Sequence, residues 1–416
     1  MTTSVFKKKL LYNIFLKCLR VAKYLAIALY RLPFLIGLDK KQIRFHIGTT
    51  KIMRNYIHHL TLENIRNHAH LELSCAEKMV IITGENGSGK TSILEAISLL
   101  SPGKGLRQSS FTEIRKHNSL PNAAAVTAWL KQEQAEHIIG TGMPPEASNK
   151  SRRQVRINGE TQRSQTVLIQ YLNVLWLTPS MDRIWQEGSS VRRKFLDRLV
   201  YAYDQEHAQR VAKYEYFLRE RIKILRTRFD KNWLNSVETQ IAELGVAIEI
   251  ARYETITRLQ QDLQNQRGPF PKPKLELSSS LNDFLDGNAR TAELFLAEAL
   301  ANNRQIDRDR ERTKIGPHRS DLSAFHQEKN MPATYCSTGE QKALLLSILL
   351  ASARTQAAWK QRTPIVLLDE VIAHLDNERR ESLINEIENL QMQVWMTGTE
   401  PEPFKDLINS AHHVSL

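Results

Sequence analysis

The chain has 416 residues, of which 41% are hydrophobic, and a formal net charge of +13. This length and apolar content suffice for one large or two ordinary globular domains, and they exclude a chain without a core. The charge is concentrated near the start: residues 1–52 contain eleven Lys or Arg and one acid, whereas the remainder contains 47 bases and 44 acids. Bulk charge therefore does not identify a nucleic acid as the partner, and a basic surface would have to be local.

Residues 1–52 combine three lysines at 7–9 with an apolar run over 24–38 that is interrupted by Arg31 and Pro33. The run is too short and too interrupted to predict a transmembrane helix. We expect a poorly ordered basic and apolar extension, no membrane partner, and a functional domain that starts at Met53; a membrane-surface helix is the alternative. The three cysteines match neither a metal-binding nor a disulfide pattern, which favours a reducing, cytoplasmic location.

The stretch 79–97 predicts a nucleotide site. It reads as a buried strand over 79–83, a glycine turn over 84–91 and the start of an amphipathic helix. The spacing is typical of a phosphate-binding loop, in which backbone amides hold the phosphates, Lys90 reaches the β and γ phosphates and the Thr91 hydroxyl ligates Mg²⁺. An ordinary strand-to-helix turn is the alternative. The predicted ATP contacts are Gly84, Glu85, Asn86, Gly87, Ser88, Gly89, Lys90, Thr91 and Ser92.

A second apolar strand, over 364–368, ends in Asp369 and Glu370. We expect Asp369 to bind Mg²⁺ through water, and Glu370 to be the catalytic residue that polarises the attacking water against the γ-phosphate. Asp376 follows at the distance of a turn that reaches the opposite protomer in some ATPases. The strand is a moderately specific signal by itself and a strong one when combined with the loop at 84–91.

Residues 335–342 precede a strongly apolar helix over 343–353. A serine and a glycine amide at a helix N-terminus form a receptor for a γ-phosphate. The loop at 84–91 and the acids at 369–370 already supply the contacts to the nucleotide within one subunit. This second receptor would therefore serve the nucleotide of another subunit, and we predict an ATP-dependent homodimer. The expected contacts in trans are Ser337, Gly339, Glu340 and Gln341. A capped core helix is the alternative.

Two turns carry further predictions. Residues 56–73 alternate as two strands around a turn with Arg66 and Asn67, for which a nucleotide contact and a solvated turn are equally compatible with the pattern. Farther along, Asn158 and Gly159 predict a tight hairpin, because Asn-Gly accepts the positive φ that such a turn requires.

Helical periodicity extends from Gly188 nearly to Gln266 and resumes over 291–312, after a break rich in glycine and proline at 268–273. Since the two halves of the nucleotide site lie on either side, these helices are most simply an arm inserted into one domain. The predicted boundaries are 53–187 for the first part of an ATPase head, 188–313 for the helical arm and 314–416 for the second part of the head.

Together these motifs resemble the Walker A, signature, Walker B and D-loop motifs of ABC ATPases, and the chain from about Met53 onwards resembles the RecF family. The residues that carry the resemblance are 64–67, 84–91, 188, 192–197, 316–321, 337–342, 368–370 and 375–376. The implied fold class is α/β, a P-loop ABC-type ATPase head with an inserted α-helical arm. The resemblance also implies a cytoplasmic, ATP-dependent DNA-binding protein of replication, repair and the SOS response, with a weak ATPase that acts as a switch. Its implied partners are double-stranded and single-stranded or gapped DNA, RecR with RecO, and the RecA pathway.

Two departures from ABC ATPases weaken the expectation for γ-phosphate sensing. The strand at 393–396 is followed by Thr397, Gly398 and Thr399, where ABC transporters usually place a switch histidine, and no convincing Q-loop glutamine follows Leu177. Slow turnover is therefore expected. The alternative function is a nucleotide-binding subunit of an ABC transporter. A structural SMC-like protein would need a far longer insertion, because a helix rises only about 1.5 Å per residue.

Overall fold

The computed structural model describes most of the chain from residue 54 onwards. The described ranges are 54–75, 78–115, 123–133, 135–143, 153–227, 230–285, 287–372, 375–408 and 411–416. The predictions for residues 1–52 fall on residues outside these ranges.

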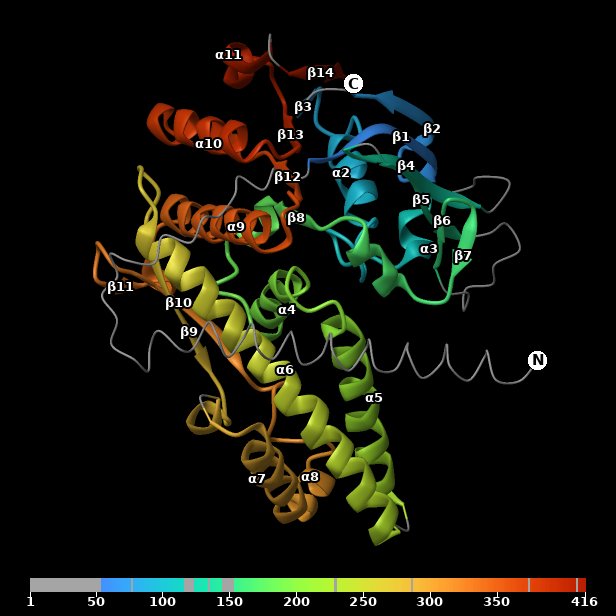
Figure 1. The fold of residues 1–416 in the computed structure, drawn as a ribbon, viewed down its shortest axis with the longest axis vertical. Coiled ribbons are helices and arrows are strands. Elements are labelled where there is room, and N and C mark those ends of the chain that lie inside the picture. Colours follow the sequence, from blue (N-terminus) through green and yellow to red (C-terminus); the bar gives the residue numbers. More distant parts are fainter. Residues whose placement is uncertain are drawn as a thin grey trace, which may run out of the picture. The chain divides into compact units, whose positions relative to one another are not determined.

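A five-stranded parallel sheet forms the central layer of the head, in the order β14-β3-β13-β12-β8 (Figure 1). Four of the strands are buried along their whole length, which is typical of a parallel sheet covered on both faces. The sheet therefore joins segments from distant parts of the sequence into one layer. The strands are β3 (Met79–Thr83), β8 (Val174–Leu177), β12 (Ile365–Asp369), β13 (Val394–Gly398) and β14 (His412–Ser415).

The two faces of this sheet belong to two hydrophobic cores. Ile81, Leu368 and Met396 join the core that contains the leucines of α9 (Thr338–Lys360). Ile82 and Trp395 point the other way and join the core that contains the apolar residues of α2 (Lys90–Ser98). Because side chains alternate along a strand, α2 and α9 cover opposite faces of the sheet.

A second, antiparallel sheet contributes to the core on the α2 side, in the order β2-β1-β4-β5-β6-β7. The hairpin predicted at Asn158 and Gly159 is confirmed: it joins β6 to β7, and both residues have positive φ, 50° and 87°. The strands are β1 (Asn55–Ile65), β2 (His68–Ser74), β4 (Ala124–Gln132), β5 (Ala135–Met143), β6 (Gln154–Ile157) and β7 (Glu160–Gln162), with the short helix α3 (Phe111–Ile114) before β4.

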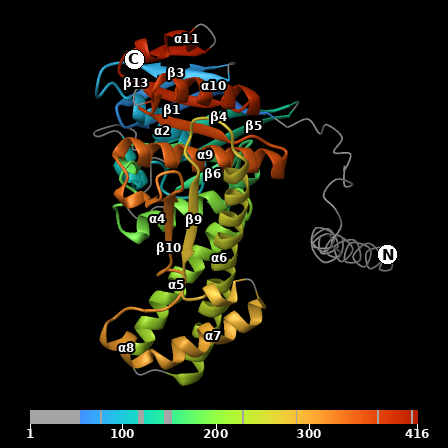
Figure 2. The same cartoon turned by 90° about the vertical axis from the view of Figure 1, so that its left-hand side faces the viewer.

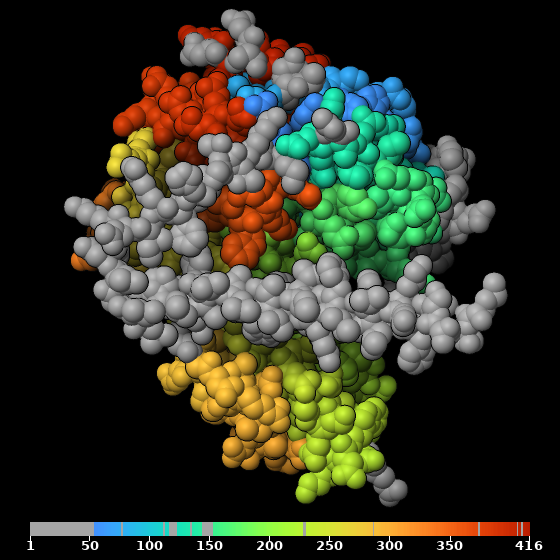
Figure 3. Space-filling view, viewed as in Figure 1, coloured from blue at the N-terminus to red at the C-terminus, as the bar shows by residue number. Residues whose placement is uncertain are grey.

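Long helices run along the arm (Figure 2), which protrudes from the head in the space-filling view (Figure 3). None of the described helices combines the length and apolarity that crossing a bilayer requires. The helices of the arm are α4 (Ser189–Val200), α5 (His207–Arg226), α6 (Lys231–Asn265), α7 (Ala289–Asn302) and α8 (Arg304–Asp309). After the arm, α9 is followed by α10 (Asn377–Leu390) and α11 (Lys405–Ile408).

The arm also contains a strand that the helical reading of 188–313 missed. β9 (Pro273–Ser278) pairs antiparallel with β10 (Asp321–His326), and β10 pairs with β11 (Met331–Pro332). Proline and glycine at 268–273 end α6 as expected, but the alternating apolar residues that follow them form a strand because β10, far along the chain, supplies its partner. β9 and β10 thus tie the arm to the segment that leads into α9.

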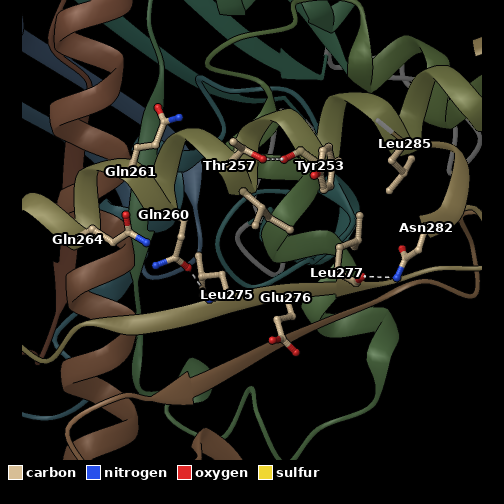
Figure 4. Close-up of a pocket in the computed structure, with 11 residues that line it drawn as sticks. Tyr253, Thr257, Gln260, Gln261, Gln264, Leu275, Glu276, Leu277, Asn282 and Leu285 are labelled. Atoms are coloured by element: carbon tan, nitrogen blue, oxygen red, sulfur yellow. Dashed lines mark hydrogen bonds between the residues drawn. The ribbon is translucent and has the colours of Figure 1, made fainter. Parts of the chain in front are cut away.

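A groove of about 560 Å³ lies between α6 and β9 (Figure 4). The Gln260 side chain accepts from the Leu275 amide at 2.7 Å and donates to the Pro273 carbonyl at 3.3 Å. Asn282 donates to the Leu277 carbonyl at 3.1 Å. These amide side chains satisfy backbone groups of a strand at the edge of its sheet, a position that otherwise invites pairing with another chain.

A buried charged network joins α4, α5, α6 and the segment that precedes β10. Arg252 donates two hydrogen bonds to Asp197, at 2.8 and 2.9 Å, and a third to the Pro317 carbonyl at 2.7 Å. His207 lies 2.7 Å from Asp197, and the Ser320 hydroxyl donates to Glu249, which itself pairs with Arg252. The segments 192–197 and 316–321 therefore meet at the base of the arm.

We expect Asp197→Asn to lower the free energy of unfolding by about 3–5 kcal/mol at pH 7, because the buried Arg252 guanidinium loses its bidentate carboxylate partner and keeps only Glu249. Burial by itself would raise the pKa of Asp197, but the charge and hydrogen bonds of Arg252 and the hydrogen bond from His207 outweigh it and lower the pKa to about 2. The stabilisation is therefore present above about pH 4 and is lost as the pH falls towards 2. Urea unfolding measured between pH 7 and pH 2 should show the free energies of unfolding of the wild type and Asp197→Asn becoming equal as the pH falls.

The exposed Asp283 provides the control, since Asp283→Asn should change stability by less than about 0.5 kcal/mol. Equal stability of the Asp197→Asn variant and the wild type at pH 7 would contradict the prediction.

Candidate nucleotide-binding site

The loop between β3 and α2 has the backbone of a phosphate cradle. Gly89, which caps α2, has a φ of 108°, and a Cβ there would lie 2.4 Å from Nε2 of His68. A Cβ on Gly84 would lie 2.7 Å from the Leu416 carbonyl oxygen. Both positions therefore require glycine, and the loop leads directly into a helix N-terminus, where backbone amides favour an anion.

Lys90 is buried within this loop. Its Nζ donates to the Gly84 carbonyl at 2.6 Å and to the Glu85 carbonyl at 2.8 Å. An ammonium that is held at the centre of the loop by its carbonyls is positioned for the phosphate oxygens that the loop would receive.

Asp369 is the meeting point of the two predicted halves of the site. Its Oδ1 accepts from the Thr91 hydroxyl at 3.0 Å and from the Thr397 hydroxyl at 2.8 Å. The described residues contain no group of three or more His, Cys, Asp or Glu that could hold a metal ion by itself. The hydroxyl and carboxylate nevertheless fit Mg²⁺, which uses few protein oxygens and completes its shell with phosphates and water.

Glu370 follows Asp369 in a strained conformation. Its φ is 55°, a region that non-glycine residues rarely adopt. Its amide donates to the Thr397 hydroxyl at 3.0 Å, and its side chain is partly exposed. Strain of this kind persists where the surroundings hold it, and it is frequent at reactive sites. The catalytic role of Glu370 stays a prediction.

The turn between β1 and β2 packs on the phosphate-binding loop. Asn67 donates to the Gly87 carbonyl at 2.7 Å, so it contacts the loop directly. Arg66 forms two hydrogen bonds of 2.9 Å with the buried carboxylate of Glu95 on α2, which raises the pKa of Arg66. The guanidinium of Arg66 thus anchors the turn to α2. The nucleotide contacts predicted for Arg66 and Asn67 stay predictions.

Ser337 caps the N-terminus of α9 and is exposed. Its amide donates to a carboxylate oxygen of Glu340 at 2.7 Å, and its hydroxyl accepts from the Glu340 amide at 3.4 Å, so the two residues form a capping box. A hydrogen bond from Lys329 and those from Ser337 lower the pKa of Glu340 to about 2. Gly339 is also exposed, with no atom within 4 Å of where a Cβ would stand.

The other predicted trans residues are engaged within their own chain. Gln341 is buried and donates to the Cys336 carbonyl at 2.8 Å. Asp376 caps α10 by accepting from the Arg379 amide at 2.9 Å. The surface left free by these contacts at the start of α9 consists of Ser337 and its neighbours up to Gly339, which is where we expect a partner's nucleotide.

The sequence pattern assigned no role to Thr397, which the structure places at the site, or to Asp182, which the structure links to α9. Thr397 bonds both acids at the end of β12, and the signal was its place at the end of the adjacent strand. Asp182 follows β8, where no Q-loop glutamine was found, and forms an ion pair of 3.0 Å with Lys342 of α9. This pair links the segment after β8 to the helix that carries Ser337.

The parallel sheet, the glycine loop, the strand that ends in two acids and the capped helix define the chain as an ABC-type P-loop ATPase head with an inserted arm, as its sequence predicted. A family model described as "RecF/RecN/SMC N terminal domain" matches residues 56–414. The chain belongs to this family, and within it to the RecF proteins, as the relatives below show.

Two curated relatives are each named "DNA replication and repair protein RecF". The protein of Mesorhizobium japonicum is 42% identical, over 87% of this chain and 96% of its own length. The protein of Rickettsia felis is 40% identical, over 88% of this chain and 99% of its own. The recombination mediator protein RecF solved as RecF-ATPrS has a TM-score of 0.74 at 22% identity, over 85% of this chain and 95% of that one. A structure of RecF-ATP has a TM-score of 0.73 at 23% identity, over 84% of this chain and 94% of that one.

Proposed function

We propose that the chain is an ATP-dependent DNA-binding protein of replication and recombinational repair, whose ATP-bound dimer is a clamp on DNA. By its likeness to the RecF relatives, it would act at single-strand gaps with RecO and RecR to aid RecA loading, in the cytoplasm and within the SOS response. Hydrolysis would be slow and would open the clamp, so that ATP serves as a switch.

The observation that carries this proposal is the separation of two phosphate receptors within one chain. Lys90 lies in the loop that starts α2, on one face of the sheet, whereas Ser337 starts α9 on the other face and is exposed. A second copy of the chain would bring its own Ser337 to the nucleotide held by Lys90. Two nucleotides at such a seam make dimerisation depend on ATP.

Each site residue has a part in this scheme. The loop from Gly84 would bind the phosphates, and Lys90 would pair with the β and γ phosphates. Thr91 and Asp369 would hold Mg²⁺, which supplies charge that neutralises the phosphate oxygens. Glu370 would orient and polarise the attacking water, a role in which positioning supplies nearly all of the catalysis.

We expect ATP to tighten DNA binding by the wild type, relative to ADP and to no nucleotide, and Lys90→Ala to abolish this effect. Loss of the charged hydrogen bonds to the phosphates should weaken ATP binding roughly 10- to 100-fold. Fluorescence anisotropy on gapped, duplex and single-stranded DNA, at one fixed salt concentration, provides the measurement.

Lys78, which is exposed just before β3, provides a control of equal charge, and Lys78→Ala should keep the response to ATP. Wild-type binding that is the same with ATP, ADP and no nucleotide would rule out the clamp. Relatives at about 40% identity over most of the chain are named RecF, which argues against a nucleotide-binding subunit of a transporter.

A further inference from the structure

The Thr397 hydroxyl is bonded to both acids at the end of β12. It donates to Oδ1 of Asp369 at 2.8 Å and accepts from the Glu370 amide at 3.0 Å. Thr397 is buried on β13, the neighbouring strand, and its Cα is the registered partner of Asp369. One hydroxyl therefore uses its donor on the predicted metal ligand and its acceptor on the predicted catalytic residue.

The hydrogen bond to the Glu370 amide accounts for the backbone of Glu370. With a φ of 55°, the chain turns sharply where the strand ends, and this conformation is unfavourable for a residue with a Cβ. The turn directs the Glu370 amide to the Thr397 hydroxyl, and the bond fixes the direction in which the Glu370 side chain leaves the strand.

The hydrogen bond to Asp369 has a different role from the one made by Thr91. Thr91 is the predicted metal ligand, and its hydroxyl serves either Asp369 or the ion. Thr397 has no second role of that kind, so it is the donor that keeps Asp369 oriented whichever way Thr91 points. A buried carboxylate that is held by a fixed hydroxyl does not have to reorganise during the reaction.

From this geometry we infer that Thr397 is a positioning residue for hydrolysis, which sets Asp369 and Glu370 without touching the nucleotide. The inference rests on the proposed function, because it assigns a residue to the hydrolysis step that would open the dimer. It predicts that removing the hydroxyl slows hydrolysis and leaves nucleotide binding and dimer formation in place, since neither Lys90 nor Ser337 is touched.

The decisive variants are Thr397→Val, which keeps the shape of the side chain and removes the hydroxyl, and Thr397→Ser, which keeps the hydroxyl. Thr397→Val should hydrolyse ATP in a single turnover at least about tenfold more slowly than the wild type, because the Glu370 amide loses its acceptor and Asp369 keeps only the hydroxyl donor of Thr91. Thr397→Ser should recover the rate to within about threefold. ATP affinity and the ATP-dependent dimer should stay within about twofold in both. Thr161, which is exposed on β7, gives the matched control, and Thr161→Val should hydrolyse ATP like the wild type.

Hydrogen exchange tests the same geometry without any nucleotide. In Thr397→Val, the amides of a peptide spanning 365–372 should exchange faster, because the Glu370 amide has lost its acceptor, while Thr397→Ser should exchange like the wild type. If Thr397→Val fails to fold, Thr397→Ala takes its place with the same expectations.

A hydrolysis rate in the hydroxyl-free variant equal to the wild type would overturn the inference, and so would a failure of serine to restore the rate. Loss of ATP binding in that variant would also overturn it, because Thr397 would then shape the loop rather than the acids. The proposed function fails on a different result, namely a wild type that shows no ATP-dependent dimer or DNA binding.

Discussion

Glu370→Gln should accumulate as an ATP-bound dimer that persists through size-exclusion chromatography. Glutamine keeps the size of the side chain but cannot polarise water as a carboxylate does, and removal of such a group costs about 10²–10⁴-fold in rate. The loop at Gly84 and Lys90 is untouched, so ATP should bind normally. Without hydrolysis, nothing would open the seam.

Sedimentation velocity with ATP, with ADP and without nucleotide gives the measurement. The double variant Lys90→Ala with Glu370→Gln is the control, and it should stay monomeric under all three conditions because it cannot hold the triphosphate. A Glu370→Gln protein that remains a monomer at saturating ATP would remove the basis for a trans site at Ser337.

The sequence alone predicted those parts of the site that are built from contiguous residues. The loop at 84–91 lies between a strand and a helix that are both contiguous with it, so its spacing alone predicts the turn. The acids at Asp369 and Glu370 follow a run of apolar residues that reads as a buried strand. The hairpin at Asn158 and Gly159 was predicted for the same reason, because the dipeptide itself accepts the backbone that the turn requires.

Contacts between distant segments account for what the sequence did not show. Thr397 is an ordinary residue at the end of a strand until pairing with β12 places it beside Asp369. β9 was absorbed into a helical region, because its partner β10 begins more than forty residues later. The sequence of the turn that contains Arg66 does not reveal its bidentate pair with Glu95, which lies on α2. The pattern therefore predicted only a nucleotide contact or a solvated side chain for Arg66.

The motifs at 192–197 and 316–321 have a structural role that the sequence did not reveal. In the sequence they only supported the resemblance to RecF proteins. In the structure, Asp197 meets Arg252 at the base of the arm, and the Pro317 carbonyl accepts from the same guanidinium. Their residue types are those needed to pair buried charge, which is costly when one partner is missing.

Ser337→Asp should abolish the ATP-dependent dimer while each monomer still binds ATP with an affinity within about threefold of the wild type. Aspartate is as good a helix cap as serine, so α9 should keep its start and the protein its stability. A carboxylate at this exposed position would face the triphosphate of the partner. At an effective dielectric constant of 20, two like charges about 4 Å apart cost about 4 kcal/mol, which weakens dimerisation on the order of a thousandfold.

Ser337→Asn is the matched control, since asparagine also caps a helix but carries no charge. It should dimerise with ATP far better than Ser337→Asp, and isothermal titration of each variant below its dimerisation concentration separates binding from assembly. If Ser337 instead served the nucleotide of its own subunit, the aspartate would weaken ATP binding by the monomer itself. Because α9 and α2 lie on opposite faces of the central sheet, we expect the loss to appear in assembly alone.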